Sequence, residues 1–207
     1  MATTIPMLLD FAGIALFSAT GALSASRKQL DIVGFIFLGT ITGIGGGTLR
    51  DLILDVPVFW VQQPYYILIC AVAAMVVYFT AHKLESRFRL LLWLDALALG
   101  AYGVFGAYKG LMVSDAPIVA VVMGMLTGTA GGILRDVIAG EPSVIMRREI
   151  YITAVILGAM VFVMLDSLGL PVPVSTTLGA VIVFAIRAGA IARGWSLPQY
   201  KPRAPKS

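Results

Sequence analysis

The sequence has one cysteine, one histidine and few charged residues. Charged side chains make up 13% of its 207 residues, about half the share of an ordinary soluble domain. One cysteine cannot form an internal disulfide, and one histidine without a nearby cysteine offers neither a metal-ligand cluster nor a Ser/His/Asp set. No glycine run is followed by the Lys-Ser/Thr of a phosphate-binding loop. We therefore expect no catalytic residues, no metal site and no enzymatic activity.

Apolar residues are abundant instead. They make up 59% of the chain, and the mean hydropathy is +0.94. A soluble domain of this length could not bury so much apolar side chain. The runs are continuous and about 20 residues long, which predicts transmembrane helices and not barrel strands. The expected fold is an all-α integral membrane protein, with one transmembrane domain over residues 1–195 and a flexible cytoplasmic tail over 196–207. Seven runs are expected to span the membrane, at residues 5–25, 31–54, 64–81, 90–109, 116–139, 150–167 and 173–192.

The basic residues give these spans an orientation. The net charge is +4, but the basic residues are scattered and make no nucleic-acid-binding patch. Thirteen of the fifteen fall on one side of the membrane, and only Arg50 and Lys109 fall on the other. The positive-inside rule then places the N terminus outside and the C terminus in the cytoplasm. The thirteen are Arg27, Lys28, Lys83, Arg87, Arg89, Arg135, Arg147, Arg148, Arg187, Arg193, Lys201, Arg203 and Lys206.

One segment of the chain occurs twice. Residues 43–51 (GIGGGTLRD) return as residues 128–136 (GTAGGILRD), and the match extends without gaps at the same separation, which we call the repeat offset. It pairs Asp10 with Asp95, Gly21 with Gly106, Ala22 with Ala107, Gly39 with Gly124, Thr42 with Thr127, and Pro57 with Pro142. The pattern predicts two three-helix repeats, about 5–82 and 90–167, followed by a seventh helix at about 173–193. Three spans are an odd number, so the second repeat enters the membrane inverted.

Glycine runs interrupt the second and fifth spans. One interpretation is that each run breaks or kinks its helix, which frees backbone carbonyls to line a wet pathway for cations. The other is close helix packing through small residues. The threonine before each run offers a hydroxyl ligand, caps the second half-helix, or bonds to its own helix backbone. The expected pore-lining set is Thr42, Gly43, Gly45, Gly46, Gly47, Thr127, Gly128, Gly131 and Gly132.

An Arg-Asp pair follows each glycine run at a depth within the membrane. Charges there are costly and usually face protein or water. Neighbouring residues on a helix point about 100° apart, so the Arg and Asp of each dipeptide are expected to be poor partners. Matching depths predict two ion pairs instead, Asp10–Arg50 and Asp95–Arg135. The alternative is that these charges only brace the fold.

Two carboxylates and a lysine complete the candidate site. The predicted ion pairs leave Asp51 and Asp136 near the pathway as cation-attracting groups. Lys109 ends the fourth expected span on the outer side. A lysine there usually reaches the membrane interface, but it could instead reach across to the fifth-span break and act as a gate.

The arrangement of spans and motifs resembles the prokaryotic branch of the trimeric intracellular cation (TRIC) channel family. The resemblance covers nearly all of residues 1–195, and its most specific parts are the paired segments GGGTLRD and GGILRD. It implies a homotrimer with one pore in each protomer, in the inner membrane of a bacterial or archaeal cell, conducting monovalent cations and chiefly K⁺. It also implies that kinked second and fifth helices line the pore, here at residues 45–47 and 131–132, and that Lys109 takes part in gating. The implied partners are other copies of the chain, membrane lipids and permeant K⁺ or Na⁺, with no cofactor. The Lys-Glu-Val phosphoinositide motif of the animal members is absent.

Three functions remain open from the sequence. The first is the K⁺-permeable channel. The second is a secondary transporter of a small solute such as glycine, because inverted repeats with broken helices suit transporters equally well. The third is a structural or assembly protein, which would leave the buried Arg-Asp pairs without a purpose.

Overall fold

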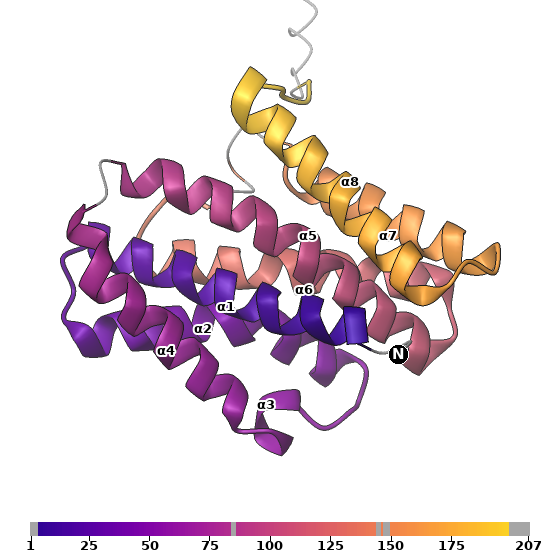
Figure 1. Cartoon of the computed structure of the whole chain (residues 1–207), viewed down its shortest axis with the longest axis horizontal. Helices are drawn as coiled ribbons and strands as arrows, with labels where there is room; N and C mark the ends of the chain where they lie inside the picture. The colour runs from indigo at the N-terminus through magenta and orange to yellow at the C-terminus, as the bar shows by residue number, and fades with distance from the viewer. Residues whose placement is uncertain (1–3, 84–85, 144–145, 147–149, 199–207) are drawn as a thin grey trace, which may run out of the picture.

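The computed structural model describes residues 4–83, 86–143, 146 and 150–198, and regular structure within them is helical throughout. Long helices lie side by side, and α7 and α8 form a pair at one edge (Figure 1). A four-residue helix, α3, precedes α4. The elements are α1 (Thr4–Arg27), α2 (Ile32–Ile53), α3 (Phe59–Gln62), α4 (Tyr65–Thr80), the 3-10 turn η1 (Ala81–Lys83), α5 (Arg87–Ser114), α6 (Pro117–Ile138), α7 (Ile152–Ser167) and α8 (Val172–Arg193).

Local sequence signals set several helix ends. The Asp31 carboxylate accepts a hydrogen bond of 2.8 Å from the Gly34 backbone N–H and so caps α2. The Ser86 hydroxyl does the same for the Arg89 N–H at the start of α5, at 3.3 Å. Pro117 is the first residue of α6, where its missing N–H costs no helical hydrogen bond. Gly194 ends α8 with φ of 67°, a left-handed conformation that suits glycine.

Each expected span coincides with a helix, but one of them is short. Six helices are long and apolar enough to cross a membrane. The helix that matches the expected sixth span, α7, is apolar but has only 16 residues. The fourth expected span ended at Lys109, whereas α5 continues to Ser114. Lys109 therefore lies more than a helical turn inside the helix and not at its end.

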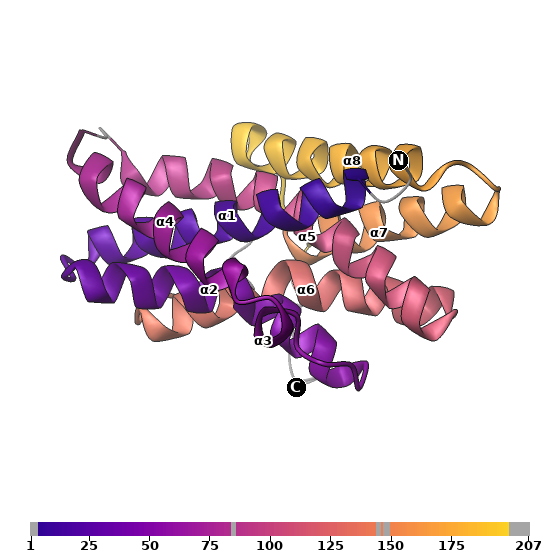
Figure 2. The same ribbon diagram turned by 60° about the horizontal axis from the view of Figure 1, so that its bottom comes forward.

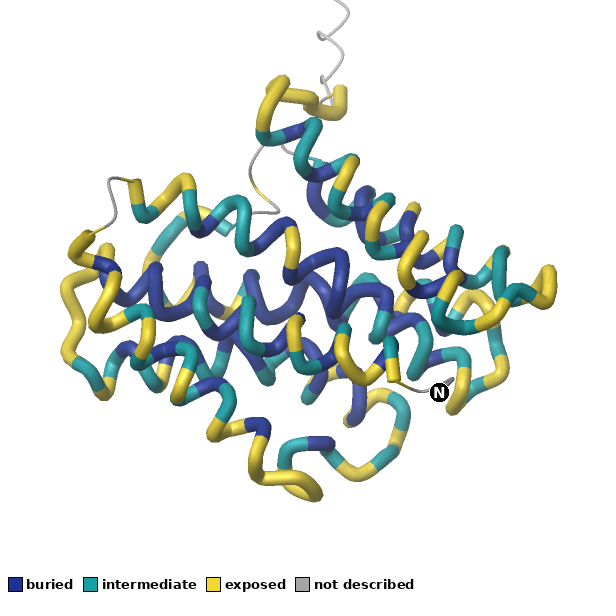
Figure 3. The backbone as a smooth tube through the Cα atoms, in the orientation of Figure 1, coloured by how far each residue is buried: buried dark blue, intermediate teal, exposed yellow. Residues whose placement is uncertain are grey.

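The centre of the molecule is formed by α1 and α5. Helix α5 packs against α1, α6, α7 and α8, while α2 packs against α1, α4 and α6. Buried residues follow these inner helices, and exposed residues follow the outer faces (Figure 3). Figure 2 shows α1 lying beside α2 from a second side. Those outer faces carry large apolar side chains such as Val33, Phe37 and Ile118. Large apolar side chains exposed over the outer faces are typical of a surface that contacts lipid.

Helices α2 and α6 run unbroken through their glycine runs, so the expected helix breaks are wrong, while a kink in either helix stays a prediction. The glycines allow the two backbones to meet instead. A Cβ on Gly46 would overlap the carbonyl oxygen of Thr127, and a Cβ on Gly131 would overlap that of Thr42, because both would approach to well under 3.0 Å. Keeping every helical hydrogen bond while packing closely avoids the cost of unpaired backbone groups in an apolar medium.

Some expectations fall on residues that the structure leaves undescribed. Arg147 and Arg148 lie outside the described residues, as does the tail from residue 199 onward. Residues 195–198, which follow α8, are described and are not helical.

Candidate functional site: two clusters of buried charge

The first cluster gathers at the end of α2. It consists of Arg50 and Asp51 on α2, Lys109 on α5, Asp10 on α1 and Tyr66 on α4, and we call it the α2 cluster. Asp51 is fully buried, and its Oδ1 accepts from Arg50 Nε at 2.7 Å and lies 2.9 Å from Lys109 Nζ. Its Oδ2 accepts the Phe59 backbone N–H at 3.0 Å. Asp51 thus binds three donors and holds the cluster together.

Two expectations about this cluster are wrong. Arg50 pairs with the adjacent Asp51, because its long side chain curls around the helix to the neighbouring carboxylate. Both Asp10 and Arg50 lie in the described part of the chain, and they form no direct ion pair with each other. The Asp10 carboxylate accepts the Tyr66 hydroxyl instead. The Arg50 guanidinium is flanked by the rings of Phe59 and Phe105, at 5.8 and 5.3 Å from their centroids.

Lys109 reaches α2 and not the glycine run of α6. Its position inside α5 directs its ammonium to Asp51, while a quarter of its side chain stays exposed. It is therefore the least buried of the charged side chains that bind Asp51. The alternative in which Lys109 reaches across to the fifth-span glycine run is wrong, because the Asp51 carboxylate on α2 is within range and binds the ammonium.

The second cluster lies at the end of α6. It consists of Arg135 and Asp136 on α6, Asp95 on α5 and Tyr151 just before α7, and we call it the α6 cluster. Arg135 Nη1 lies 2.7 Å from Asp95 Oδ1, the second pair expected from the sequence. The same guanidinium donates to Asp136 Oδ1 at 2.9 Å and to the Thr20 hydroxyl at 3.0 Å. Arg135 therefore bridges both carboxylates, whereas Arg50 contacts only one.

The two clusters lie well apart along the inner helices. On α1, Asp10 belongs to the α2 cluster and Thr20 contacts the α6 cluster. Ten residues of helix separate them, or about 15 Å. On α5, Lys109 and Asp95 are separated by about 21 Å at the same rise per residue. The crossing of α2 and α6 at Gly46 and Gly131 lies between the clusters.

The threonines at this crossing are placed differently from each other. The Thr42 hydroxyl donates to the Leu38 carbonyl on its own helix at 2.6 Å, which is the ordinary role of a membrane threonine. The buried Thr127 hydroxyl finds no hydrogen-bond partner among the described residues. A Cβ on Gly21 would overlap the Thr42 hydroxyl, and one on Gly106 would overlap the Thr127 hydroxyl. These two contacts are themselves related by the repeat offset.

Three contributing residues were not singled out from the sequence. Tyr66 and Tyr151 are separated by the repeat offset, so the repeat pattern could have found them. Arg187 was counted only as an orientation signal. In the structure it is fully buried on α8, donates to the Ile150 carbonyl at 3.3 Å and lies over the ring of Tyr151. A lone arginine within an apolar run was the available signal.

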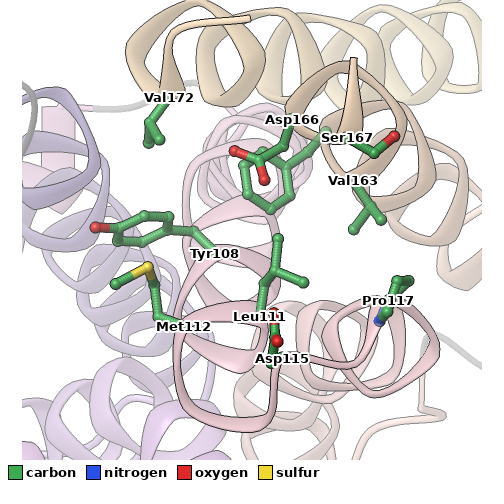
Figure 4. A pocket seen from close by; sticks show the side chains of 10 residues that line it. Tyr108, Leu111, Met112, Asp115, Pro117, Val163, Asp166, Ser167 and Val172 are labelled. Atoms are coloured by element: carbon green, nitrogen blue, oxygen red, sulfur yellow. The ribbon is translucent and has the colours of Figure 1, made fainter. Parts of the chain in front are cut away.

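An open pocket lies at the end of the molecule where α5 ends and α6 begins. It encloses about 410 Å³, and its lining includes Asp115, Asp166 and Tyr108 (Figure 4). Asp115 follows α5 in a left-handed conformation, and Asp166 lies near the end of α7. None of the side chains lining this pocket belongs to the pore-lining set expected from the sequence.

Known proteins resemble the chain over nearly its whole length. A family model described as "Glycine transporter" matches residues 7–82 and again residues 92–167. The UPF0126 inner membrane protein YadS of Escherichia coli (strain K12) is 37% identical over 198 residues, which cover 93% of this chain and 94% of that protein. A UPF0126 membrane protein of Vibrio cholerae is 33% identical over 203 residues, covering 96% and 84% of the two chains. The solved structure of the TRIC trimeric intracellular cation channel orthologue from Rhodobacter sphaeroides is 49% identical, with a TM-score of 0.90, and the match covers 93% of this chain and 100% of that one.

Proposed function

Because this chain belongs to the bacterial branch of the trimeric intracellular cation (TRIC) channel family, we propose that it is a channel for monovalent cations, chiefly K⁺, in the inner membrane. The observation that carries the proposal is the Lys109–Asp51 ion pair. It sets a partly exposed ammonium on a fully buried carboxylate, 2.9 Å away. An ammonium in that place occupies the carboxylate that a passing cation would approach.

The pathway runs along the crossing of α2 and α6. Its support is the position of the crossing between two buried charged clusters, each at the end of one of these helices. Buried charges within a membrane protein generally mark an ion or substrate path. The glycines at the crossing permit α2 and α6 to bend or slide without a side chain in the way, and Asp51 and Asp136 supply negative charge at its two ends.

Lys109 is the gate of this pathway. In the arrangement described above, its ammonium neutralises Asp51 and closes the α2 end. Opening requires the ammonium to leave Asp51, which exposes a carboxylate to entering cations. The partial exposure of Lys109 supports this role, because about a quarter of its side chain already lies outside the packed interior.

The proposed assembly is a homotrimer in which each protomer carries its own pore. The support is that the similar Rhodobacter sphaeroides orthologue is a trimeric channel. Within each protomer the two three-helix halves are inverted repeats, with the N terminus outside and the C terminus in the cytoplasm. The family model matches the chain twice, from residue 7 and from residue 92, and this separation equals the repeat offset, which supports the repeat. Lipids cover the exposed apolar faces.

A secondary transporter of a small solute such as glycine is the second candidate. One observation favours it, namely the family model described as "Glycine transporter" that matches both halves. A transporter would use the same two clusters as gates on opposite sides of one site. Saturation of the flux by its substrate distinguishes this candidate from a channel.

The test is a recording from purified protein in planar bilayers under a KCl gradient. We expect unitary currents that reverse near the K⁺ equilibrium potential. Lys109→Gln removes the ammonium from Asp51, so we expect the ratio of open to closed time to rise about tenfold with unit conductance kept. Lys83→Gln, which changes an exposed lysine outside the α2 cluster, is the matched control.

Two other outcomes would change the proposal. Absence of current in the bilayer, together with saturable uptake of labelled glycine into vesicles, would support the transporter in place of the channel. If Lys109→Gln leaves the currents unchanged, the proposed gating role of Lys109 is contradicted, while the proposed channel function stands.

A further inference from the structure

The pocket of Figure 4 lies where four helix ends meet, and we call it the helix-end pocket. It encloses about 410 Å³ between the ends of α5 and α7 and the starts of α6 and α8. Asp115 and Asp166 both line it, and within the described part of the chain neither carboxylate forms an ion pair. None of the described residues that line the pocket is basic. The pocket therefore offers negative charge that its own lining does not neutralise.

The rest of the pocket lining is apolar and aromatic, with one hydroxyl. The rings of Tyr108 and Phe162 meet edge to face, with their centroids 6.3 Å apart. The Ser167 hydroxyl donates to the Met164 carbonyl at 2.7 Å, which leaves its oxygen lone pairs free to accept from a ligand. Oxygen acceptors and aromatic rings both attract an ammonium group. The lining therefore fits a cationic group that is attached to an apolar body.

An apolar groove continues from this pocket along the outer faces of α6 and α7, and we call it the α6–α7 groove. It encloses about 500 Å³, and Pro117, Val163 and Ser167 line both cavities. It extends to Val122 on α6 and back to Met160 on α7, which is about 8 Å along α6 and about 10 Å along α7. Its described lining carries no charged side chain. The two cavities thus form one continuous site with a charged part and an apolar part.

The order of the two cavities matches the depth profile of a bilayer. The helix-end pocket lies where the chain leaves the apolar layer, whereas the groove lies along the apolar lengths of α6 and α7. Helix α7 has 16 residues and extends about 24 Å, less than the usual hydrocarbon thickness of about 30 Å. A span that is too short thins the bilayer around it, which brings lipid headgroups to its end. Asp166 lies at that end of α7.

The start of α6 supplies charge of the opposite sign. Helix α6 begins at Pro117, and its N-cap residue, Ala116, makes no side-chain hydrogen bond to it. The first N–H groups of a helix have no acceptor within the helix, and the helix dipole is positive there, so this end suits a phosphate group. Because Pro117 lines both cavities, the positive end of α6 lies between the carboxylates of the pocket and the apolar groove.

We propose that the helix-end pocket and the α6–α7 groove together bind one phospholipid with a primary-amine headgroup, such as phosphatidylethanolamine. The ammonium lies between Asp115 and Asp166, the phosphate lies at the start of α6, and an acyl chain lies in the groove. The lipid carries its ammonium, phosphate and acyl chain in the same order as the three parts of the site. Binding of this lipid does not depend on whether the protein conducts cations.

Native mass spectrometry of the purified, detergent-solubilised protein tests the preference for the headgroup. Phosphatidylethanolamine and phosphatidylglycerol with identical acyl chains are added separately. We expect phosphatidylethanolamine to bind about tenfold more tightly, since phosphatidylglycerol has a hydroxyl group where the site would hold an ammonium between two carboxylates. Equal binding of the two lipids, or tighter binding of phosphatidylglycerol, overturns the proposal.

Replacing both carboxylates tests their role in that preference. In the double variant Asp115→Asn, Asp166→Asn we expect phosphatidylethanolamine to lose its tenfold advantage, while phosphatidylglycerol binds about as before. Asp115 is exposed, Asp166 is half-buried, and neither forms an ion pair in the described part of the chain, so the variant should fold. Asp55→Asn, which changes an exposed carboxylate outside both cavities, is the matched control. A double variant that keeps the full preference contradicts the proposed site.

Two further measurements test the groove. Glycerophosphoethanolamine, which has the headgroup without acyl chains, should bind at least about a hundredfold more weakly, since burial of several methylene groups is lost. Equal binding would leave the groove without a role and overturn the proposal. Ile118 is exposed and lines the groove, so Ile118→Cys should form no disulfide between copies of the chain under oxidising conditions. Such a disulfide would show that a second copy, and not a lipid, covers the groove.

Discussion

At the scale of single residues, the buried carboxylate of Asp51 decides how the α2 end is held together. It is the meeting point of Arg50, Lys109 and the first N–H of α3. Removing one member of a buried ion pair generally costs about 3–5 kcal/mol, because the remaining charge loses its partner in a medium that solvates it poorly. Asp51 has two cationic partners, so its loss leaves two positive charges facing each other without the anion between them.

Asp51→Asn is therefore expected to destabilise the protein strongly. We expect the apparent Tm of the detergent-solubilised protein to fall by about 10 °C. Asp55→Asn is the matched control, since Asp55 is exposed and has φ of 52°, a conformation that asparagine tolerates. Thermal unfolding followed by circular dichroism measures both. Equal Tm values for the two variants would show that the Asp51 contacts contribute little to stability.

At the scale of helices, α2 and α6 can cross closely because glycines, which have no side chain, lie at the contact. The two closest approaches are Gly46 to the Thr127 carbonyl and Gly131 to the Thr42 carbonyl, and the two contacts are related by the repeat offset. Helix association in a lipid environment depends on close packing, because no hydrophobic force draws apolar helices together. The glycines therefore stabilise the crossing in this state, and both helices continue through it.

Adjacent glycines of α2 should respond very differently to the same substitution. In Gly46→Ala the new methyl group would overlap the Thr127 backbone, so the helices must separate. In Gly45→Ala it would meet only the tip of the Leu134 side chain, at 2.7 Å, which can rotate away. We expect Gly46→Ala to cost about 1–3 kcal/mol and Gly45→Ala to stay near wild type. Thermal unfolding measures the difference. An equal loss in both variants would mean that the crossing is looser than described.

At the scale of the whole molecule, the distribution of charge predicts the orientation of a largely apolar protein. Thirteen of fifteen basic residues fall on one side of the expected topology, and we expect that side to face the cytoplasm under the positive-inside rule. The orientation depends on α7 crossing the membrane. With 16 residues it extends about 24 Å, somewhat less than the usual hydrocarbon thickness of about 30 Å.

Cysteine labelling in intact cells tests the orientation and the crossing of α7 together. We expect Gln62→Cys and Ser167→Cys to react with a membrane-impermeant maleimide added from outside. Lys83→Cys and Met146→Cys should react only after the membrane is permeabilised. All four positions are exposed, and the wild-type chain is the blank because its sole cysteine, Cys70, is buried. Labelling of Ser167→Cys and Met146→Cys from the same side would show that α7 does not cross.

Much of this protein follows from its sequence alone. The lengths of the apolar runs determine where the helices lie, because crossing an apolar layer requires every backbone group to bond within its own helix. The repeat offset identifies the residues that matter in pairs, including the matched Asp and Arg positions and both glycine runs. These features are local or periodic, so they can be inferred from the order of residues.

Only the tertiary structure decided which partner each polar group takes. Arg50 has Asp10 and Asp51 within its neighbourhood and binds the adjacent one, while Tyr66 captures Asp10. Lys109 reaches Asp51 because α5 continues beyond it. The glycine runs allow two continuous helices, α2 and α6, to pack closely against each other, and they do not break either helix. In each case several polar groups from distant segments of the chain lie within a few ångströms of one another and compete for the same partner. Small differences in their positions decide which pair forms, and the spacing of residues in the sequence does not encode those differences.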